Sequence, residues 1–332
     1  MSSILNIELL DSLMNQEHEP IAASVDWPDN VPDPRLTRSS YSSGLLFNGC
    51  ERKYQLQKLS AIGSNSEDDW RSKLTFGFGH AVGEGIQNIL MGKERNRIIF
   101  DLFCKWKEDL YAENEKQKKT FFHMMFAIDK FLAMRQDGFL DEYELVYYNG
   151  QPAAELSYRI NFPDGFKERG YVDIVLRNKI TGKFAIFEIK TNSGMYLQSS
   201  SYRNSGQATG YSIILDKIEP GQADYTVYYL VYMTRSMEWE CFEFPKTRSM
   251  RAQWVIDKLH DFQRLKSLVD ERGNLGIWPI RGNHCVSYGR ECKYLGTCQL
   301  PTERLIQPLT EDQIEETVNY TFEFEWEELI DA

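Results

Sequence analysis

The sequence has no hydrophobic run long enough to cross a membrane. Its longest apolar stretches, 98–103 and 228–233, fall far short of the ~18 residues that a membrane-spanning helix needs. The N-terminal segment has no basic residues ahead of a long apolar core, so we predict no secretory signal. We therefore expect a cytoplasmic protein that does not associate with membranes.

Positive charge is also in short supply. The 332 residues include 38 Lys and Arg against 49 Asp and Glu, which gives a net charge of −11. This balance excludes a protein that coats nucleic acid nonspecifically, although one local basic groove remains compatible with it. With 42% hydrophobic and 13% aromatic residues, the chain is globular and can bury a substantial core.

Cysteine is scarce but unevenly placed. The chain has six cysteines, and three of them, Cys285, Cys292 and Cys298, lie close together near the C-terminus. In a cytoplasmic chain such a group more often binds metal than forms disulfides. Three thiolates are one short of a complete tetrahedral site or cubane cluster, and Cys50 is the natural fourth ligand.

The other candidates near these cysteines are expected to play no part in metal binding. Cys104 and Cys241 lie in apolar surroundings and are predicted to be buried thiols. His284 is an alternative ligand beside Cys285, but with four cysteines available we expect it to be a bystander.

Apolar spacing predicts the secondary structure. A helix capped by Ser42 and Ser43 is expected to run through 44–59, followed by a polar loop at 60–73. Further helices are predicted at 76–92, 94–112, 117–136, 202–216 and 247–272, and strands at 143–148, 153–160, 170–176, 183–190, 224–233 and 238–245. The acidic end, 323–332, is expected to be a tail or a short helix. This order indicates an α/β or α+β fold around a central mixed sheet.

Two neighbouring predicted strands carry charged residues in otherwise apolar sequence. Asp173 interrupts one strand, and Glu188 and Lys190 project from the same face of the next. Buried charges are costly unless they are paired or bind metal, and two carboxylates are suitable ligands for Mg²⁺ or Mn²⁺. The lysine could position a water molecule or stabilise charge on a phosphorus centre. The alternative is a structural salt bridge at a sheet edge.

The helix predicted after these strands carries a polar stripe. Gln207 and Tyr211 are four residues apart, and Arg203 lies one turn earlier on the same face. This set could hold a phosphate backbone and a flanking base. The alternative is a half-exposed amphipathic face.

The motifs GYVDIVL, FEIKT and QATGY, in this order and spacing, resemble the PD-(D/E)XK nuclease superfamily, and within it the RecB-type branch. The resemblance implies a restriction-endonuclease-like core. It implies Asp173, Glu188 and the backbone carbonyl of Ile189 as metal ligands, and Lys190 as the catalytic lysine. It also implies Gln207 and Tyr211 as supporting residues on the DNA side.

One motif departs from the family pattern. Many RecB-type nucleases have G-x-x-x-H on an early helix, with the histidine as a further metal ligand. In this chain the matching segment begins at Gly79 and has Gly83 in the place of the histidine. Either Glu84 or His80 is a candidate replacement, and Glu84 is favoured because other branches use an acid on this helix. The alternative is that both side chains face solvent.

One N-terminal and three C-terminal cysteines around such a core resemble the iron–sulfur subgroup of these nucleases, which includes the AddB nuclease domain and exonucleases of CRISPR adaptation. This resemblance implies a [4Fe-4S] cluster held by Cys50, Cys285, Cys292 and Cys298. The gap of five residues before Cys298 matches the pattern, whereas the gap of six before Cys292 is longer. Structural Zn²⁺ is the alternative.

These resemblances predict a Mg²⁺- or Mn²⁺-dependent DNA exonuclease, acting on single-stranded or resected DNA in recombination, repair or turnover. The expected host is a bacterium or a virus-infected cell, including a phage-infected one. No G-x-x-x-x-G-K-[ST] phosphate loop is present, so unwinding would need a separate helicase or recombination protein. The alternatives are a structure-specific endonuclease and a catalytically degenerate DNA-binding subunit.

The predicted domain organisation has five parts. They are a weakly ordered arm (1–38), a helical region joined to the core (39–138), the nuclease core (139–272), a cysteine-rich iron–sulfur cap (273–300) and an acidic tail (301–332).

Overall fold

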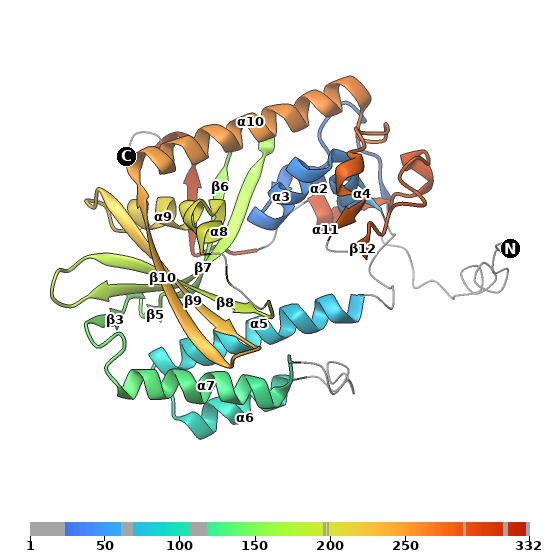
Figure 1. Ribbon diagram of the computed structural model, residues 1–332. Helices are drawn as coiled ribbons and strands as arrows, with labels where there is room; N and C mark the ends of the chain where they lie inside the picture. Colours follow the sequence, from blue (N-terminus) through green and yellow to red (C-terminus); the bar gives the residue numbers. More distant parts are fainter. Residues whose placement is uncertain are drawn as a thin grey trace, which may run out of the picture.

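The computed structural model describes residues 24–60, 69–106, 118–194, 197, 199–287, 290–314 and 318–329. A mixed sheet of eight strands forms the centre of this part, with helices on both faces (Figure 1). The predicted α/β fold around a central mixed sheet is therefore confirmed. Within the same residues, no helix is long and apolar enough to span a membrane.

The main path of the sheet runs in the order β10-β9-β8-β7-β6-β14, and β2 and β3 each pair with β7 beside it. The strands are β2 (Arg38–Ser39), β3 (Tyr143–Leu145), β6 (Ala154–Asn161), β7 (Lys167–Asn178), β8 (Phe184–Asn192), β9 (Asp224–Met233), β10 (Glu238–Thr247) and β14 (Phe322–Glu325). The strand predicted at 224–233 coincides with β9. The strand predicted at 143–148 is instead divided between β3 and β4 (Tyr147–Tyr148), and β4 pairs with β5 (Gln151–Pro152).

The connections between strands explain the mixed sheet. β6, β7 and β8 form an antiparallel meander, and Gly182 takes a φ of 70° in the turn between β7 and β8. After β8 the chain passes through α8 (Ser200–Arg203) and α9 (Gly206–Ile218), and returns as β9 parallel to β8. This crossover places α9 on one face of the sheet.

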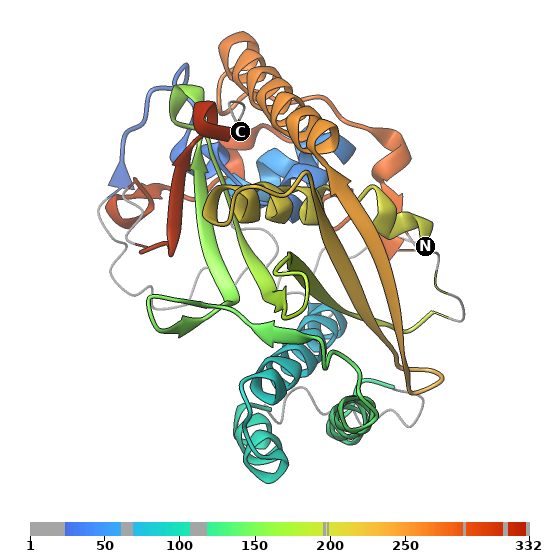
Figure 2. The same cartoon turned by 90° about the vertical axis from the view of Figure 1, so that its left-hand side faces the viewer.

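Helices cover the two faces of the sheet and make two separate cores (Figure 2). On one face, α9 and α10 (Arg248–Arg272) pack on a core that includes Tyr211, Tyr229 and Trp254. On the other face lie α5 (Asp69–Leu90), α6 (Arg95–Lys105) and α7 (Phe121–Gln136), with a core that includes Phe78 and Phe187. Because α5 begins at Asp69, it starts inside the segment predicted to be a loop at 60–73.

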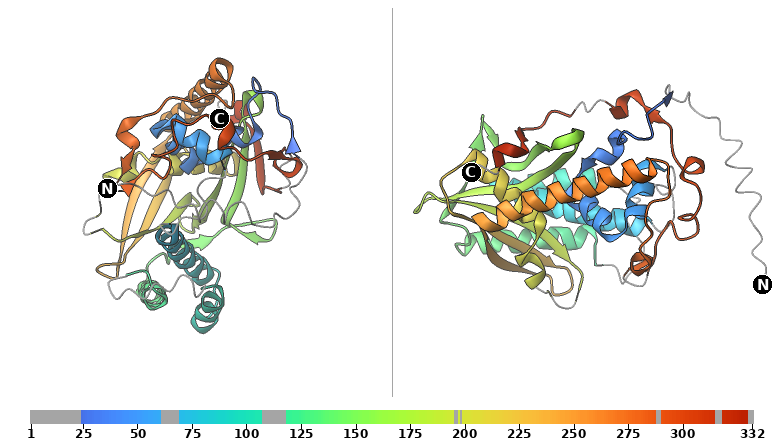
Figure 3. Two further views of the ribbon diagram at one scale, coloured as in Figure 1. Left: turned by 90° about the vertical axis from the view of Figure 1, so that its right-hand side faces the viewer. Right: turned by 90° about the horizontal axis from the view of Figure 1, so that it is seen from above.

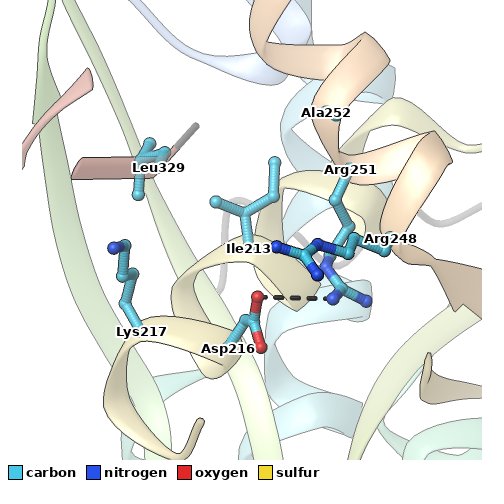
Figure 4. Close-up of a pocket in the computed structure, with 7 residues that line it drawn as sticks. All are labelled: Ile213, Asp216, Lys217, Arg248, Arg251, Ala252 and Leu329. Carbon is cyan, nitrogen blue, oxygen red and sulfur yellow. Dashed lines mark hydrogen bonds and ion pairs between the residues drawn. The ribbon is translucent and has the colours of Figure 1, made fainter. Parts of the chain in front are cut away.

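A basic pocket lies between α9 and α10 (Figure 4). Arg251 donates to Asp216 over 3.3 Å, and Arg248 and Lys217 also line the pocket, which Leu329 closes on one side. Asp216 and Lys217 are at the C-terminal end of α9, whereas Gln207 is in its first turn. At 1.5 Å per residue the pocket is therefore more than about 10 Å from the polar N-terminal end of that helix.

The first predicted helix is two helices. α3 (Tyr41–Gly49) and α4 (Glu51–Leu59) are separated at Cys50, whose backbone is extended at φ −160° and ψ 110°. Ser40 and Ser43 form a capping box at the start of α3, so the cap begins two residues before the one predicted. The break presents Cys50 at the N-terminus of α4, which is a position that periodicity alone does not reveal.

Both ends of the described chain join the domain (Figure 3). In the predicted arm, β1 (Ser24–Val25) pairs with β13 (Leu309–Thr310), α2 (Pro34–Thr37) buries Leu36, and β2 joins the sheet. In the predicted tail, α11 (Glu311–Ile314) follows β13, and β14 lies parallel to β6. The Glu323 carboxylate accepts a hydrogen bond from Arg159, and the Glu325 carboxylate accepts one from Asn161. Both segments are therefore more structured than the sequence analysis expected. In the tail, the reason is that the acidic side chains have partners on β6. Residues 1–23 lie outside the described part.

Candidate active site

Asp173, Glu188 and Lys190 come together where the β7–β8 ladder ends. The last residue pair between β7 and β8 is Ile174–Phe187. Asp173 is the next residue of β7 beyond this pair, on the N-terminal side of Ile174. Instead of a backbone ladder bond, the Asp173 carboxylate accepts the backbone N–H of Ile189 over 3.0 Å. Glu188 is fully buried and forms an ion pair with Lys190. The strands thus deliver the three predicted side chains to one point.

The electrostatics of this group are unfavourable for two carboxylates alone. Burial raises the pKa of Asp173 well above its usual range, and the nearby Glu188 carboxylate raises it further. For Lys190 burial lowers the pKa, but Glu188 and Asp173 outweigh this effect and raise it above its usual value. Lys190 is therefore protonated. Its ammonium pairs with Glu188 Oε1, whereas Glu188 Oε2 has no hydrogen-bond partner in the described residues. A site of this kind is suited to binding a cation.

A chain of hydrogen bonds links Lys190 to α9. Lys190 Nζ donates to Gln207 Oε1 over 3.1 Å, and Gln207 Nε2 donates to the Tyr211 hydroxyl over 2.6 Å. Tyr211 is almost completely buried, and burial raises its pKa. The predicted pair on one helix face is therefore in contact with the charged group on β8.

Arg203 does not belong to this stripe. The helix predicted at 202–216 is divided, and Arg203 ends the separate helix α8. Its guanidinium carbon lies 5.6 Å from the centre of the Phe244 ring on β10. The prediction that Arg203 shares a helix face with Gln207 is wrong, because the chain changes direction at Asn204 and Ser205 between the two helices.

Helix α5 passes the ends of the same strands on the opposite face of the sheet from α9. A Cβ on Gly79 would lie 3.6 Å from Thr191 Oγ1 on β8, and Gln87 Nε2 lies 3.5 Å from Glu155 Oε1 on β6. Gly83 is about one turn from each and lies on the same side of α5. A Cβ on Gly83 would meet nothing within 4 Å, so the helix leaves open space there.

Neither candidate replacement for the missing histidine reaches Asp173. Glu84 forms an ion pair with Lys105 on α6, and His80 is exposed on α5. The residues of this region that sequence reasoning missed are Gln87 and Glu155. The signal for Gln87 was its helical spacing of four from Gly83, but nothing in the sequence marked Glu155, which depends on the pairing of β6 with β7.

The four predicted cluster cysteines line a single pocket. Cys50 lies at the N-terminus of α4, and Cys285, Cys292 and Cys298 come from the segment that follows α10, which includes the short hairpin of β11 (Val286–Ser287) and β12 (Arg290–Glu291). Burial raises the pKa of Cys298, and the neighbouring thiols of Cys285 and Cys292 raise it further. Thiolates are the donors that both an iron–sulfur cluster and zinc use, although the four are not placed closely enough in the described residues to hold one metal ion.

The remaining cysteine and histidine expectations have different outcomes. Cys104 and Cys241 are both exposed, so the prediction that they are buried is wrong. Cys104 lies on the side of α6 that is not packed against the core, and Cys241 is on the edge strand β10. His284 lines the cysteine pocket, but its ring also packs against Gly49, where a Cβ would lie 3.3 Å from Nδ1.

Arg52 fastens the cysteine segment to α4. Its fully buried guanidinium donates to the carbonyl of Cys298 over 2.8 Å and to that of Leu300 over 2.7 Å. A second link joins Arg281 to Glu51 through two hydrogen bonds of 2.8 Å. The segment is thus held to the domain by charged hydrogen bonds as well as by any metal centre.

The described residues contain no group of three or more His, Cys, Asp or Glu side chains placed closely enough to hold one metal ion. At the β7–β8 site the expected protein ligands are two carboxylates and one backbone carbonyl. Two side chains and a carbonyl are compatible with Mg²⁺, which usually keeps several waters. The observation that fits a cation is the buried Glu188 carboxylate, whose Oε1 is paired with Lys190 while its Oε2 has no hydrogen-bond partner in the described residues.

Comparisons with known proteins give little further information. No family model and no curated protein matches the chain. Among solved structures, it is similar to a "putative exonuclease" from Eubacterium rectale, at 13% identity and a TM-score of 0.44, over 86% of this chain and 95% of that one. At this level of similarity, the residues of the site must carry any assignment of function.

Proposed function

We propose that the protein is a metal-dependent deoxyribonuclease that hydrolyses phosphodiester bonds, with Asp173, Glu188 and Lys190 as its reactive centre. The observation that carries this proposal is the buried Glu188 carboxylate, which has Lys190 as its ion-pair partner and Asp173 beside it. Such an arrangement is costly in a metal-free protein, and costly charge arrangements are characteristic of functional sites.

Each residue has a role that follows from its position. Asp173, Glu188 and the Ile189 carbonyl would hold Mg²⁺ or Mn²⁺. The bound ion would polarise a phosphoryl oxygen and lower the pKa of a coordinated water molecule. The protonated Lys190 can stabilise negative charge on the phosphoryl group or orient the attacking water. Gln207 fixes the ammonium group of Lys190, and Tyr211 fixes Gln207.

The exonuclease mode, a preference for single-stranded or resected DNA, and a partner helicase or recombination protein are supported by the family resemblance. The same resemblance supports a [4Fe-4S] cluster in the pocket of four cysteines, with zinc as the alternative.

The test is an anaerobic incubation of the full chain with 5′- and 3′-labelled linear DNA, beside closed circular single-stranded DNA. Each substrate is incubated with Mn²⁺, Mg²⁺ or EDTA, and Lys190→Ala is the control variant. Metal-dependent loss of linear DNA that the variant abolishes supports the exonuclease, and the label that is released first gives its polarity.

Two results would change the assignment. Cleavage of the circles would indicate an endonuclease, since an exonuclease needs a free end. DNA that stays intact with every metal but is still bound would indicate a DNA-binding subunit in which the departure at Gly83 has removed activity.

A further inference from the structure

The pocket between α9 and α10 gathers positive charge in an acidic protein. Lys217, Arg248 and Arg251 line it beside a single acid, Asp216, although the whole chain has a net charge of −11. Figure 4 shows these side chains reaching the pocket from both helices. Its volume is about 50 Å³, which is several times the ~10–15 Å³ that one water molecule requires. The pocket therefore has room for a small anion of several atoms.

Only one of the three cations is neutralised inside the protein. Arg251 is buried, donates to two backbone carbonyls and forms an ion pair with Asp216 over 3.3 Å. Lys217 and Arg248 have no ion-pair partner in the part of the chain that the structure describes. The pocket thus keeps an excess of two positive charges. A phosphate monoester carries a charge of about −1.5 to −2 at neutral pH and would balance them.

The first turn of α10 adds to this excess. The positive end of a helix dipole lies at the N-terminus, where acidic side chains are favourable and basic ones are not. The first turn of this 25-residue helix contains no acidic residue, whereas Arg248 is its first residue and Arg251 follows three positions later. An anion in the pocket would relieve the repulsion between these arginines and the helix end.

The pocket is separate from the β7–β8 site. Lys217 is ten residues beyond Gln207 on α9, which places the two about 15 Å apart along the helix. Ile213 and Leu329 supply apolar walls, so the cationic groups occupy only part of the lining. A ligand here would therefore not be the phosphodiester bond that Lys190 faces.

We propose that this pocket binds the phosphate monoester group of a nucleotide, either a free mononucleotide or the 5′ end of a DNA strand. Arg248 and Lys217 contact the phosphate oxygens, and Arg251, held in place by Asp216, adds positive charge behind them. Guanidinium groups suit this ligand because they can donate two parallel hydrogen bonds to it. The inference does not rest on the proposed function, since none of these residues belongs to the β7–β8 site.

The test is isothermal titration calorimetry of the full chain in EDTA, with inorganic phosphate, thymidine 5′-monophosphate or thymidine. Phosphate and the monophosphate are expected to bind, and thymidine is not. Arg248→Gln and Lys217→Gln should each weaken binding at least about tenfold, because each removes one charge-assisted contact. Arg235→Gln removes an exposed arginine between β9 and β10 and should leave binding unchanged. Thermal unfolding midpoints equal to that of the unmodified protein would show that all three variants are folded.

Oligonucleotides with and without a 5′ phosphate distinguish the two sources of the ligand. If the phosphorylated strand binds more tightly than thymidine monophosphate, and Arg248→Gln removes the difference, the pocket holds a strand end. Equal or weaker binding of the strand assigns the pocket to a free nucleotide. The inference is wrong if the unmodified protein binds neither phosphate nor the monophosphate. It is also wrong if both pocket variants bind them as tightly as Arg235→Gln does.

Discussion

Lys190 on β8 donates a hydrogen bond of 3.1 Å to Gln207 on α9, although 17 positions separate the two residues in the chain. The strand carries Lys190 beyond the last β7–β8 pair, Ile174–Phe187, and the crossover brings the first turn of α9 over it. Because Gln207 is in turn held by Tyr211, the ammonium group of Lys190 has a fixed position beside Glu188. This relationship gives the first prediction.

Gln207→Ala is expected to lower the rate of DNA hydrolysis about tenfold, because Lys190 keeps its charge but loses the partner that fixes its position. Lys190→Ala removes the charge itself and should cost about 10²–10³ in rate. The measurement is kcat on labelled linear DNA with Mn²⁺, and binding with Ca²⁺ serves as the control for the fold. Equal losses in the two variants would contradict a supporting role for Gln207.

Asp173→Asn is expected to stabilise the metal-free protein at neutral pH while abolishing hydrolysis. The folded-state pKa of Asp173 is raised by burial and by Glu188, so the folded state binds more protons than the unfolded state. Its contribution to stability therefore falls as the pH rises from the ordinary pKa of an aspartate through the raised folded-state pKa. The asparagine variant should lack this loss and gain on the order of 1 kcal/mol. Urea unfolding in EDTA at pH 4 and pH 7 measures the effect, and an equal difference at both values would contradict it.

Gly83→His is expected to be tolerated, because a side chain there enters open space. It is also expected to strengthen Mn²⁺ binding, because the family resemblance places a metal-ligating histidine at this position. Replacing a glycine inside a helix should also leave stability unchanged or raise it by up to about 1 kcal/mol. The matched control is Gly85→Ala, where a Cβ would lie 2.1 Å from Ile128 Cδ1 on α7. That variant should lose about 1–3 kcal/mol through overpacking. Thermal unfolding and Mn²⁺ titration of both variants make the comparison.

Arg52→Met is expected to destabilise the domain by about 3 kcal/mol or more. The variant preserves much of the buried volume but leaves the acceptors at Cys298, Leu300 and Gln55 without their donor. The control is Arg281→Met, which removes a more exposed link to Glu51 and should cost less. Limited proteolysis should show cleavage near 273–302 first in the Arg52 variant, and cleavage elsewhere would argue against this role.

Cys298→Ser is expected to remove any broad absorbance near 400 nm and to reduce the metal content of anaerobically purified protein. Cys241→Ser is the matched control, because that thiol is exposed and lies outside the pocket of four cysteines. Iron in the unmodified protein would support the cluster, and stoichiometric zinc would support the alternative. Identical metal content in the two variants would remove Cys298 from the ligand set.

The sequence could predict the strands and the motif residues on them, because both signals are local. The apolar runs around Asp173 and Glu188 mark buried strands, and the charges within them are conspicuous for that reason. The clustering of Cys285, Cys292 and Cys298 is also visible in the chain itself. These features do not depend on where the helices begin and end.

Other features were misread because they depend on contacts between distant segments. Periodicity gave one helix across Cys50 and one from 202 to 216, whereas the structure breaks both. The acidic residues 323 and 325 looked solvated, but β6 supplies them with Arg159 and Asn161. The pattern of charges along one segment cannot show that another strand supplies hydrogen-bond partners for them.

The sequence alone therefore determined which side chains could do chemistry, since apolar strands with isolated charges and grouped cysteines are properties of short segments. Only the tertiary structure decided which of them meet. It joins Lys190 to Gln207, gathers Cys50 with three cysteines more than 200 residues away, and ties Glu84 to Lys105 instead of Asp173. The reason is physical: sheet pairing and helix packing fix these distances, and neither is encoded in the spacing of residues along the chain.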